Sequence, residues 1–277
     1  MRRRFRQVDV FTDVAYRGNP VAVVLDGDEL TTEEMQRFAN WTNLSETTFV
    51  LPPTESQGDY RVRIFTPVLE LPFAGHPTLG TCHAWRTSGG RPHRDDVVVQ
   101  ECAAGLITIR TSGDRLAFAT PPLVRSGPVD EAFVERIASV LRISRDDILA
   151  AEWVDNGPGW VAVMLESAEA VLAVQPAPID FDLGVVGPYP PGSPHAIEVR
   201  AFFPKDGVTV EDPVTGSLNA GLAQWLIGRG RAPDSYVASQ GTALGRAGRV
   251  HVDRIGDDIW VGGSTKTNIK GVLSFQP

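Results

Sequence analysis

Two stretches decide the fold: ELPFAGHP at residues 70–77 and EDPVTGSL at residues 211–218. They share a Glu-x-Pro start and a glycine at the sixth position, and a further glycine follows at Gly80 and Gly221. Every matched position is separated by the same distance (211 − 70 = 141 residues). A pattern repeated at a fixed spacing is the trace of an internal duplication. The chain is therefore predicted to contain two similar halves.

Each copy follows a strand-like segment, RIFTP at residues 63–67 and RAFFP at residues 200–204. Each also precedes a segment compatible with a helix, at residues 78–85 and 218–227. A helix that starts after Pro and Gly leaves backbone N–H groups at its N-terminus, where a carboxylate or phosphate can bind. Two such starts are expected to face one cleft that holds a small anionic ligand between the halves.

The polar residues of the two copies differ. The first copy has His76 where the second has Ser217, and the second has Asp212 where the first has Leu71. A site that acts on an asymmetric substrate needs different groups on its two faces, so His76, Asp212 and Ser217 are candidates for acid/base or hydrogen-bonding roles. The alternative is that His76 only caps a helix or is a buried imidazole with satisfied hydrogen bonds, and that Asp212 only caps the helix or forms a turn before Pro213.

Composition limits the function. The chain has 277 residues, of which 42% are hydrophobic and 22% charged, which suits two globular domains. A net charge of −8 argues against a nucleic-acid or anionic-membrane partner. Cys82 and Cys102 lack the paired spacing of a disulfide framework or a zinc site, which is typical of a reducing cytoplasm. Arg2 to Arg4 precede a strand pattern and not an apolar run, so we expect neither a signal peptide nor a membrane partner.

The order of elements predicts an α+β fold with two pseudo-symmetric domains. Thr31 and Glu34 form a capping-box pattern that predicts a helix start. The first domain is expected at residues 1–122, completed by a strand near residues 266–277, and the second at residues 129–265. The Pro-rich segment at residues 121–128 is expected to link them.

The chain resembles the PhzF-like proteins of phenazine biosynthesis, which are relatives in fold of diaminopimelate epimerase. The matching segments follow the family's order along nearly the whole chain: VDVFTD at 8–13, GNP at 18–20, NLSETTF at 43–49, FAGHPTLG at 73–80, NGP at 156–158 with Trp160, EDPVTGS at 211–217, and QG at 240–241 with GR at 245–246.

This resemblance implies a diaminopimelate epimerase-like architecture, in which each domain is a mostly antiparallel sheet wrapped around a central helix and the site lies between the domains. It implies a homodimer, a small carboxylate-bearing substrate, and no metal or organic cofactor. It also implies proton transfer, in which Glu46 moves a proton between substrate carbons with His76 and Asp212 as partners. The substrate-binding residues it implies are Ser45, Gly75, Gly216 and Ser217.

Without the resemblance, Glu46 is a carboxylate at the head of an apolar strand, a place where burial can raise the pKa of a base. The related epimerases carry a catalytic thiol just before the glycine of each half, and those positions are Ala74 and Thr215 here. A carboxylate-based isomerase is therefore favoured over a two-thiol racemase.

Three alternatives stay open. One is an epimerase- or racemase-like activity on an amino or hydroxy acid. Another is a catalytically silent small-molecule-binding protein on the same fold. The third is a nucleotide-binding oxidoreductase, suggested by the glycines at positions 241, 245 and 248, although these do not form a GxGxxG motif.

Overall fold

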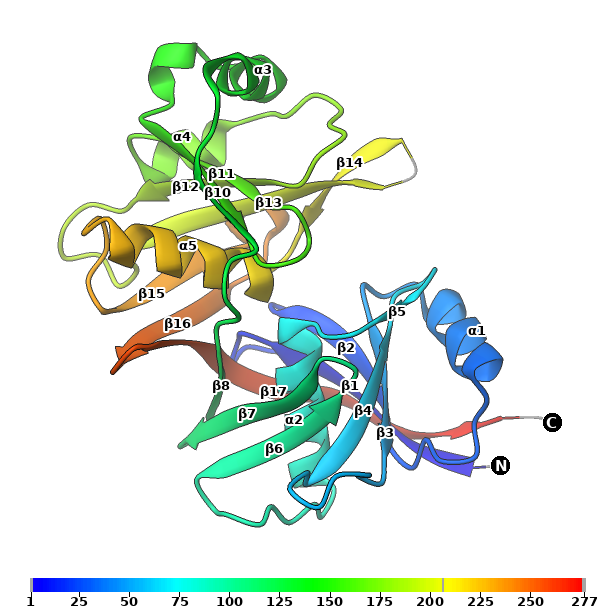
Figure 1. The fold of residues 1–277 in the computed structure, drawn as a ribbon. Helices are drawn as coiled ribbons and strands as arrows, with labels where there is room; N and C mark the ends of the chain where they lie inside the picture. Colours follow the sequence, from blue (N-terminus) through cyan, green and yellow to red (C-terminus); the bar gives the residue numbers. More distant parts are fainter. Residues whose placement is uncertain (1, 206, 276–277) are drawn as a thin grey trace. The chain divides into compact units, whose positions relative to one another are not determined.

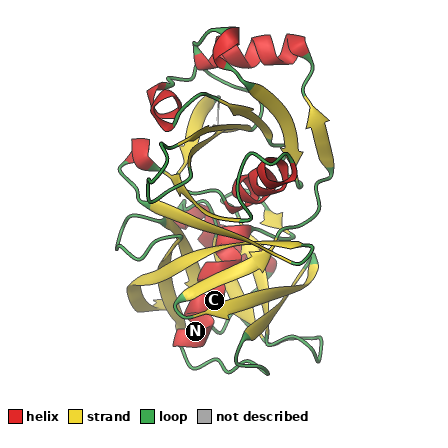
Figure 2. Ribbon diagram, turned by 90° about the vertical axis from the view of Figure 1, so that its left-hand side faces the viewer, coloured by secondary structure: helices red, strands yellow, loops and turns green. Residues whose placement is uncertain are grey.

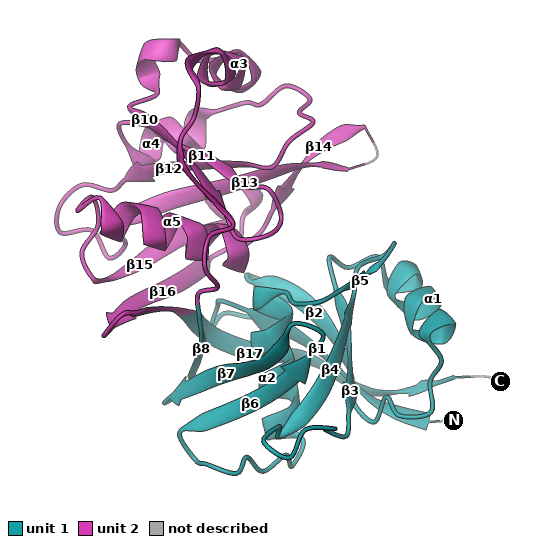
Figure 3. Ribbon diagram, viewed as in Figure 1, with its two compact units in different colours: residues 1–119, 262–277 teal, residues 120–261 magenta. Residues whose placement is uncertain are grey.

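The computed structural model describes residues 2–205 and 207–275, and the chain divides into two compact units (Figures 1 and 3). Unit 1 consists of the residues up to Ala119 together with the segment from Gly262 onward, and unit 2 spans Thr120–Val261. Strands far outnumber helices (Figure 2). This mixed, sheet-dominated architecture agrees with the expected α+β class. Within the described ranges, no helix is long and apolar enough to cross a membrane.

Unit 1 is built on one sheet that closes on itself. Its strands are β1 (Arg2–Val10), β2 (Asn19–Val24), β3 (Thr47–Leu51), β4 (Tyr60–Phe65), β5 (Glu70–Leu71), β6 (Val97–Cys102), β7 (Gly105–Ser112), β8 (Arg115–Ala119) and the last part of β17 (Asp258–Ser274). The pairs β2–β3 and β4–β6 are parallel, whereas β1–β2, β3–β4, β6–β7 and β7–β8 are antiparallel. Strand β17 pairs with both β1 and β8, which closes the sheet.

Helix α2 (Gly75–Thr87) contacts β1, β2, β3, β6 and β8 of this sheet, and nearly all of its first ten residues are buried. Gly80 permits the close approach. A Cβ atom at that position would lie 2.3 Å from Val21 Cγ1, a distance that no packed methyl group tolerates. The glycine that ends the first repeat therefore lets the helix pack directly against β2.

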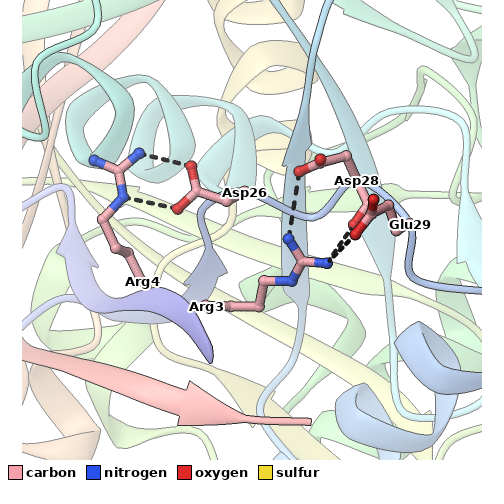
Figure 4. A network of polar contacts seen from close by, with 5 residues as sticks. All are labelled: Arg3, Arg4, Asp26, Asp28 and Glu29. Carbon is pink, nitrogen blue, oxygen red and sulfur yellow. Dashed lines mark hydrogen bonds and ion pairs between the residues drawn. The ribbon is translucent and has the colours of Figure 1, made fainter. Parts of the chain in front are cut away.

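Two further features fix the N-terminal part of unit 1. Helix α1 (Thr32–Thr42) starts with the predicted capping box, since the Thr31 hydroxyl accepts from the Glu34 N–H and the Glu34 carboxylate accepts from the Thr31 N–H. The basic residues near the start of the chain lie in β1 (Figure 4). Arg4 makes two 2.7 Å hydrogen bonds to Asp26, and the buried Arg3 donates to the Asp28 carbonyl, so β1 is tied to the turn after β2.

Unit 2 contains β9 (Arg125–Pro128), β10 (Ala150–Asp155), β11 (Val161–Met164), β12 (Leu183–Pro188), β13 (Ile197–Lys205), β14 (Val208–Asp212), β15 (Ser235–Gln240), β16 (Gly248–Ile255) and the start of β17, with helices α3 (Glu131–Leu141), α4 (Ala168–Ala173) and α5 (Gly216–Gly228). The pairs β11–β12 and β13–β15 are parallel. Helix α5 packs on β10, where a Cβ at Gly221 would lie 2.2 Å from the Val154 carbonyl oxygen.

The order of elements recurs in the two units. In unit 1, β1, β2, α1, β3, β4, β5, α2, β6, β7 and β8 follow one another, and β10, β11, α4, β12, β13, β14, α5, β15, β16 and β17 repeat that order. The parallel pairs occur at corresponding places, β2–β3 with β11–β12 and β4–β6 with β13–β15. Strand β9 and helix α3 precede the second set.

The hairpin in front of each repeated helix is held by the same ion pair. Arg63 makes hydrogen bonds of 2.8 and 2.6 Å to Glu70 across β4 and β5. Arg200 makes hydrogen bonds of 3.0 and 2.7 Å to Glu211 across β13 and β14. Each guanidinium also lies over the ring of the phenylalanine two residues further along its strand, at 5.1 and 4.8 Å. Such two-pronged contacts fix the geometry of the hairpin that leads into the helix.

The interpretation of residues 121–128 as a linker is wrong for their last four members. Residues 125–128 form β9, which pairs with β10, and Ser126 lies opposite Val154. Strand β9 contains one proline, Pro128, and lies at the edge of a sheet, where a missing N–H is tolerated. It is therefore part of unit 2, which starts at Thr120.

Candidate active site

Three segments of unit 1 bring polar side chains together at the start of α2. Strands β2 and β3 are parallel, so their N-terminal ends lie at the same edge of the sheet. Asn19 is the first residue of β2, Glu46 immediately precedes β3, and His76 is the second residue of α2. Glu46 Oε2 lies 3.2 Å from His76 Nε2, and Asn19 Nδ2 lies 3.5 Å from His76 Nδ1.

The His76 imidazole is uncharged. Its side chain is 8% exposed, and burial lowers its pKa from 6.5 to about 3, with only partial compensation from the Pro20 carbonyl. The 3.2 Å separation from Glu46 Oε2 is therefore a close approach of a carboxylate to a neutral imidazole.

Glu46 combines a fixed backbone with a side chain that is still reachable. Its carbonyl accepts from the Ala22 N–H at 3.4 Å, and the following Thr47 is fully buried. Its side chain is 16% exposed. A general base needs this combination, because it must be held in place and also reach a substrate proton.

Ser45 is exposed in the bend before β3, and Gly75 is buried at the start of α2.

Neither repeated helix has a side-chain cap within the described part of the chain. The N-cap residues are Ala74 for α2 and Thr215 for α5, and neither side chain accepts from the first helical turn. Pro77, at the third position of α2, has no N–H to satisfy. Both helices therefore start without the side-chain acceptor that usually neutralises the positive end of the helix dipole.

In unit 2, a second polar group surrounds the start of α5. Asp212 is the last residue of β14, and its Oδ2 accepts from Thr215 Oγ1 at 2.5 Å. Gln240, which is fully buried on β15, donates from Nε2 to Thr215 Oγ1 at 3.0 Å. Asp212 is consequently the outermost member of a connected chain of hydrogen bonds.

Ser217 is the second residue of α5 and is half-buried. Its hydroxyl oxygen accepts from Trp160 Nε1 at 3.0 Å, and its carbonyl accepts from Asn156 Nδ2 at 2.9 Å. The segment that contains Asn156 and Trp160 thus holds Ser217 from two sides. Gly216 next to it is buried.

Several predicted site residues do gather. Glu46 and His76 are in contact in unit 1, and Asp212, Gly216 and Ser217 lie within six residues of one another in unit 2. Five supporting residues have no role in the sequence prediction: Asn19, Asn156, Trp160, Thr215 and Gln240. All five belong to segments quoted above for the resemblance (GNP, NGP with Trp160, EDPVTGS and QG), and these segments are the signal that could identify them.

Both cysteines are free and buried, as expected from the sequence for Cys82. Burial raises the pKa of the Cys82 thiol to about 12. Among the described residues, no three His, Cys, Asp or Glu side chains are grouped so that they could hold a metal ion.

Comparison with known proteins defines the family. A model of the phenazine biosynthesis-like proteins matches residues 8–272. The chain belongs to this family. Within this PhzF-like family, the chain is 36% identical over 289 residues to the protein named antisense-enhancing sequence 1 of Schizosaccharomyces pombe, covering 96% of this chain and 97% of that one. It is 37% identical over 255 residues to the trans-2,3-dihydro-3-hydroxyanthranilate isomerase of Pseudomonas aeruginosa, covering 90% and 89%. Isomerase is thus the enzyme class of this chain as predicted.

Solved structures show the same fold. A PhzF-family protein of Bacillus anthracis superposes with a TM-score of 0.84 over 99% of this chain and all of that chain, at 23% identity. A hydroxyproline epimerase of Agrobacterium vitis superposes with a TM-score of 0.58 over 98% of this chain and 92% of that chain, at 13% identity. The PhzF-like fold of this chain is therefore related to that of epimerases.

Proposed function

We propose that this PhzF-like protein is a cofactor-independent isomerase that moves a proton between two carbons of a small carboxylate-bearing substrate. Glu46 is the acid/base. The observation that carries this proposal is the 3.2 Å contact between a partly exposed carboxylate and a neutral imidazole at the head of two parallel strands. The Pseudomonas aeruginosa relative is named an isomerase, which supports the same reaction class.

In this mechanism, the Glu46 carboxylate removes a proton from a carbon next to a conjugated or carboxylate-bearing system. The electron pair of the broken C–H bond moves into that system, and Glu46 returns the proton to a different carbon, so no atom is gained or lost. We propose that the neutral His76 ring, 3.2 Å from the carboxylate, keeps it aimed at the substrate. We propose that Asp212 assists the proton transfer, and that Ser45, Gly75, Gly216 and Ser217 hold the substrate and steady the developing charge.

The test is proton exchange in heavy water. The first substrate to try is trans-2,3-dihydro-3-hydroxyanthranilate, followed by a panel of small amino and hydroxy acids. The wild type should incorporate deuterium, and Glu46→Gln should slow this incorporation at least about 100-fold, because the amide cannot act as a base. The matched control is Glu33→Gln, an exposed carboxylate of the same unit. Equal exchange by Glu46→Gln and wild type would show that another residue is the base.

An epimerase-like activity is the second candidate, and the structural likeness to hydroxyproline epimerase favours it. It predicts that deuterium returns to the same carbon with inverted configuration. Chiral chromatography of the exchanged panel separates the two reactions. The expected homodimer is a further part of the proposal, and light scattering of the purified protein measures it.

A further inference from the structure

Each unit contains a fully buried glutamine at the same place in the repeat. Gln100 lies on β6 and Gln240 on β15, and they are 140 residues apart (240 − 100). Each binds the fourth residue of the repeated helix. Gln100 Nε2 donates to Thr78 Oγ1 at 2.9 Å, and Gln240 Oε1 accepts from Asn219 Nδ2 at 2.8 Å. This contact belongs to the scaffold that the two units share.

The remaining hydrogen bonds of the two glutamines differ. Gln100 Oε1 accepts from the hydroxyl of the buried Tyr60 at 2.9 Å, which keeps it inside the core. Gln240 turns towards the start of α5. Its Oε1 also accepts from the Thr215 N–H at 3.0 Å, and its Nε2 donates to the Asp212 carbonyl at 3.2 Å and to Thr215 Oγ1 at 3.0 Å.

The four hydrogen bonds of Gln240 decide which atom donates at each step between Gln240 and Asp212. Because Gln240 Oε1 accepts from two N–H donors, its Nε2 end must be the one that donates to Thr215 Oγ1. The Thr215 hydroxyl has a single hydrogen, which is then directed at Asp212 Oδ2, 2.5 Å away. This is the length of a hydrogen bond from a hydroxyl to a carboxylate. Asp212 therefore receives a proton donor at this oxygen.

Helix capping does not account for the Thr215 hydroxyl. A threonine at the N-cap usually accepts from an N–H of the first turn, and Thr215 makes no such bond. In the first repeat the matched N-cap is Ala74, and the residue that matches Asp212 is Leu71. The hydroxyl and the carboxylate thus occur together in one copy and are both missing from the other. This pattern indicates that they act as a pair.

We propose that Thr215 and Gln240 are positioning residues for Asp212. The buried amide of Gln240 orients the Thr215 hydroxyl, and the hydroxyl holds the Asp212 carboxylate in one rotamer. This inference rests on the proposed function, because the position of Asp212 affects turnover only if Asp212 takes part in the reaction.

A double-mutant cycle tests the coupling. Thr215→Val keeps the shape of the side chain and removes the hydroxyl, so it should lower kcat/KM about 10- to 100-fold, the range of a hydrogen bond to a charged group. Thr215→Ser keeps the hydroxyl and should stay within about threefold of the wild type. In an Asp212→Asn background, Thr215→Val should have almost no further effect. Additive losses would mean that Thr215 acts without Asp212.

Gln100→Leu is the matched control for Gln240→Leu. Both variants remove a buried glutamine and should lower the melting temperature. Only Gln240→Leu should also lower the kcat/KM of the folded enzyme, because only Gln240 is linked to Asp212. Equal kcat/KM losses in the two variants would mean that Gln240 has only a structural role.

A measurement without turnover completes the test. Crystal structures should show the Asp212 side chain in its wild-type rotamer in Thr215→Ser and in another rotamer in Thr215→Val. An unchanged rotamer in Thr215→Val overturns the inference whatever the substrate is. The two proposals fail separately. Full exchange by Glu46→Gln contradicts the proposed function, whereas full activity of Thr215→Val beside an inactive Glu46→Gln contradicts only the positioning role.

Discussion

Glu46 Oε2 and His76 Nε2 lie 3.2 Å apart, and the imidazole of this pair carries no charge. This matters for the proposed chemistry because an imidazolium at 3.2 Å would stabilise the carboxylate strongly and make it a weaker base. A neutral ring packs against the carboxylate at a smaller electrostatic cost to proton uptake. The buried position of His76 at the start of α2 is what keeps the ring neutral.

The first prediction concerns the ring itself. With a pKa of about 3, His76 should not titrate between pH 5 and 8. Its imidazole nitrogen signals, assigned by their loss in His76→Gln, should keep the chemical shifts of a neutral ring over this range. A midpoint near 6.5 would contradict the neutral ring.

The second prediction is a loss of stability in acid. The folded-state pKa of His76 lies below its ordinary value of 6.5, so the unfolded chain takes up a proton below pH 6.5 that the folded chain does not bind until about pH 3. The resulting stability is present above pH 6.5 and is lost as the pH falls. At pH 5 this loss amounts to about 2 kcal/mol relative to pH 7.

Urea denaturation of wild type and His76→Gln at both pH values measures this effect. The fall in unfolding free energy from pH 7 to pH 5 should be smaller in the variant by about that amount. Comparing the change between the two pH values cancels the pH-independent cost of the substitution. Equal falls in the two proteins would rule out His76 as a source of the acid sensitivity.

The third prediction compares the two hairpin ion pairs. The side chains of Arg200 and Glu211 are only 7% and 10% exposed, against 25% and 35% for Arg63 and Glu70. Arg200 also donates to the Val174 carbonyl just after α4. Arg200→Met should therefore destabilise the protein by about 3–5 kcal/mol, because it leaves a buried carboxylate unpaired.

Arg63→Met, made as the matched variant, should cost no more than about 1 kcal/mol, because its carboxylate partner stays hydrated. Thermal denaturation of the two variants provides the comparison. Equal losses would mean that burial does not distinguish the two copies.

The fourth prediction concerns the glycines that end the repeats. Gly80→Ala and Gly221→Ala should each cost at least about 1–3 kcal/mol through overpacking. The two differ in what the new methyl group meets, which is the Val21 side chain in one case and the Val154 backbone in the other. Val21→Ala should restore part of the stability of Gly80→Ala, whereas no side-chain substitution at position 154 should rescue Gly221→Ala.

The control for both glycines is Gly228→Ala at the end of α5, where an added Cβ meets no atom within 4 Å. It should leave the stability unchanged or raise it, since alanine has the higher helix propensity. A large destabilisation by Gly228→Ala would mean that helix α5 is sensitive to any substitution, and that the packing argument does not explain Gly221.

Local signals in the sequence were sufficient for many elements. The capping box at Thr31 and the strand that includes residues 63–65 lie where the sequence predicts them, because both depend on neighbouring residues alone. The edge strand at residues 125–128 is missed, because the prolines of the segment at residues 121–128 carry a turn signal that the pairing partner overrides. Helix α4 is too short to show a hydrophobic period.

The sequence indicates some residues of the candidate site but not the contacts between them. The repeat points to His76 and Asp212, since its two copies differ at these polar positions. That Glu46 faces His76 depends on the parallel pairing of β2 with β3, and that Thr215 faces Asp212 depends on the turn between β14 and α5. Both contacts depend on the folded structure and cannot be predicted from the spacing of the residues along the chain.

Strand β17 has a consequence for the order in which the protein can form during synthesis. Residues 265–274 pair with β1, and β8 also pairs with this strand. The sheet of unit 1 therefore has two unpaired edges until the ribosome has released the end of β17. All of unit 2 emerges before that moment. The half of the protein that is translated first is thus the half that closes last, and a premature stop codon after residue 261 would open the sheet around residues made more than 180 codons earlier.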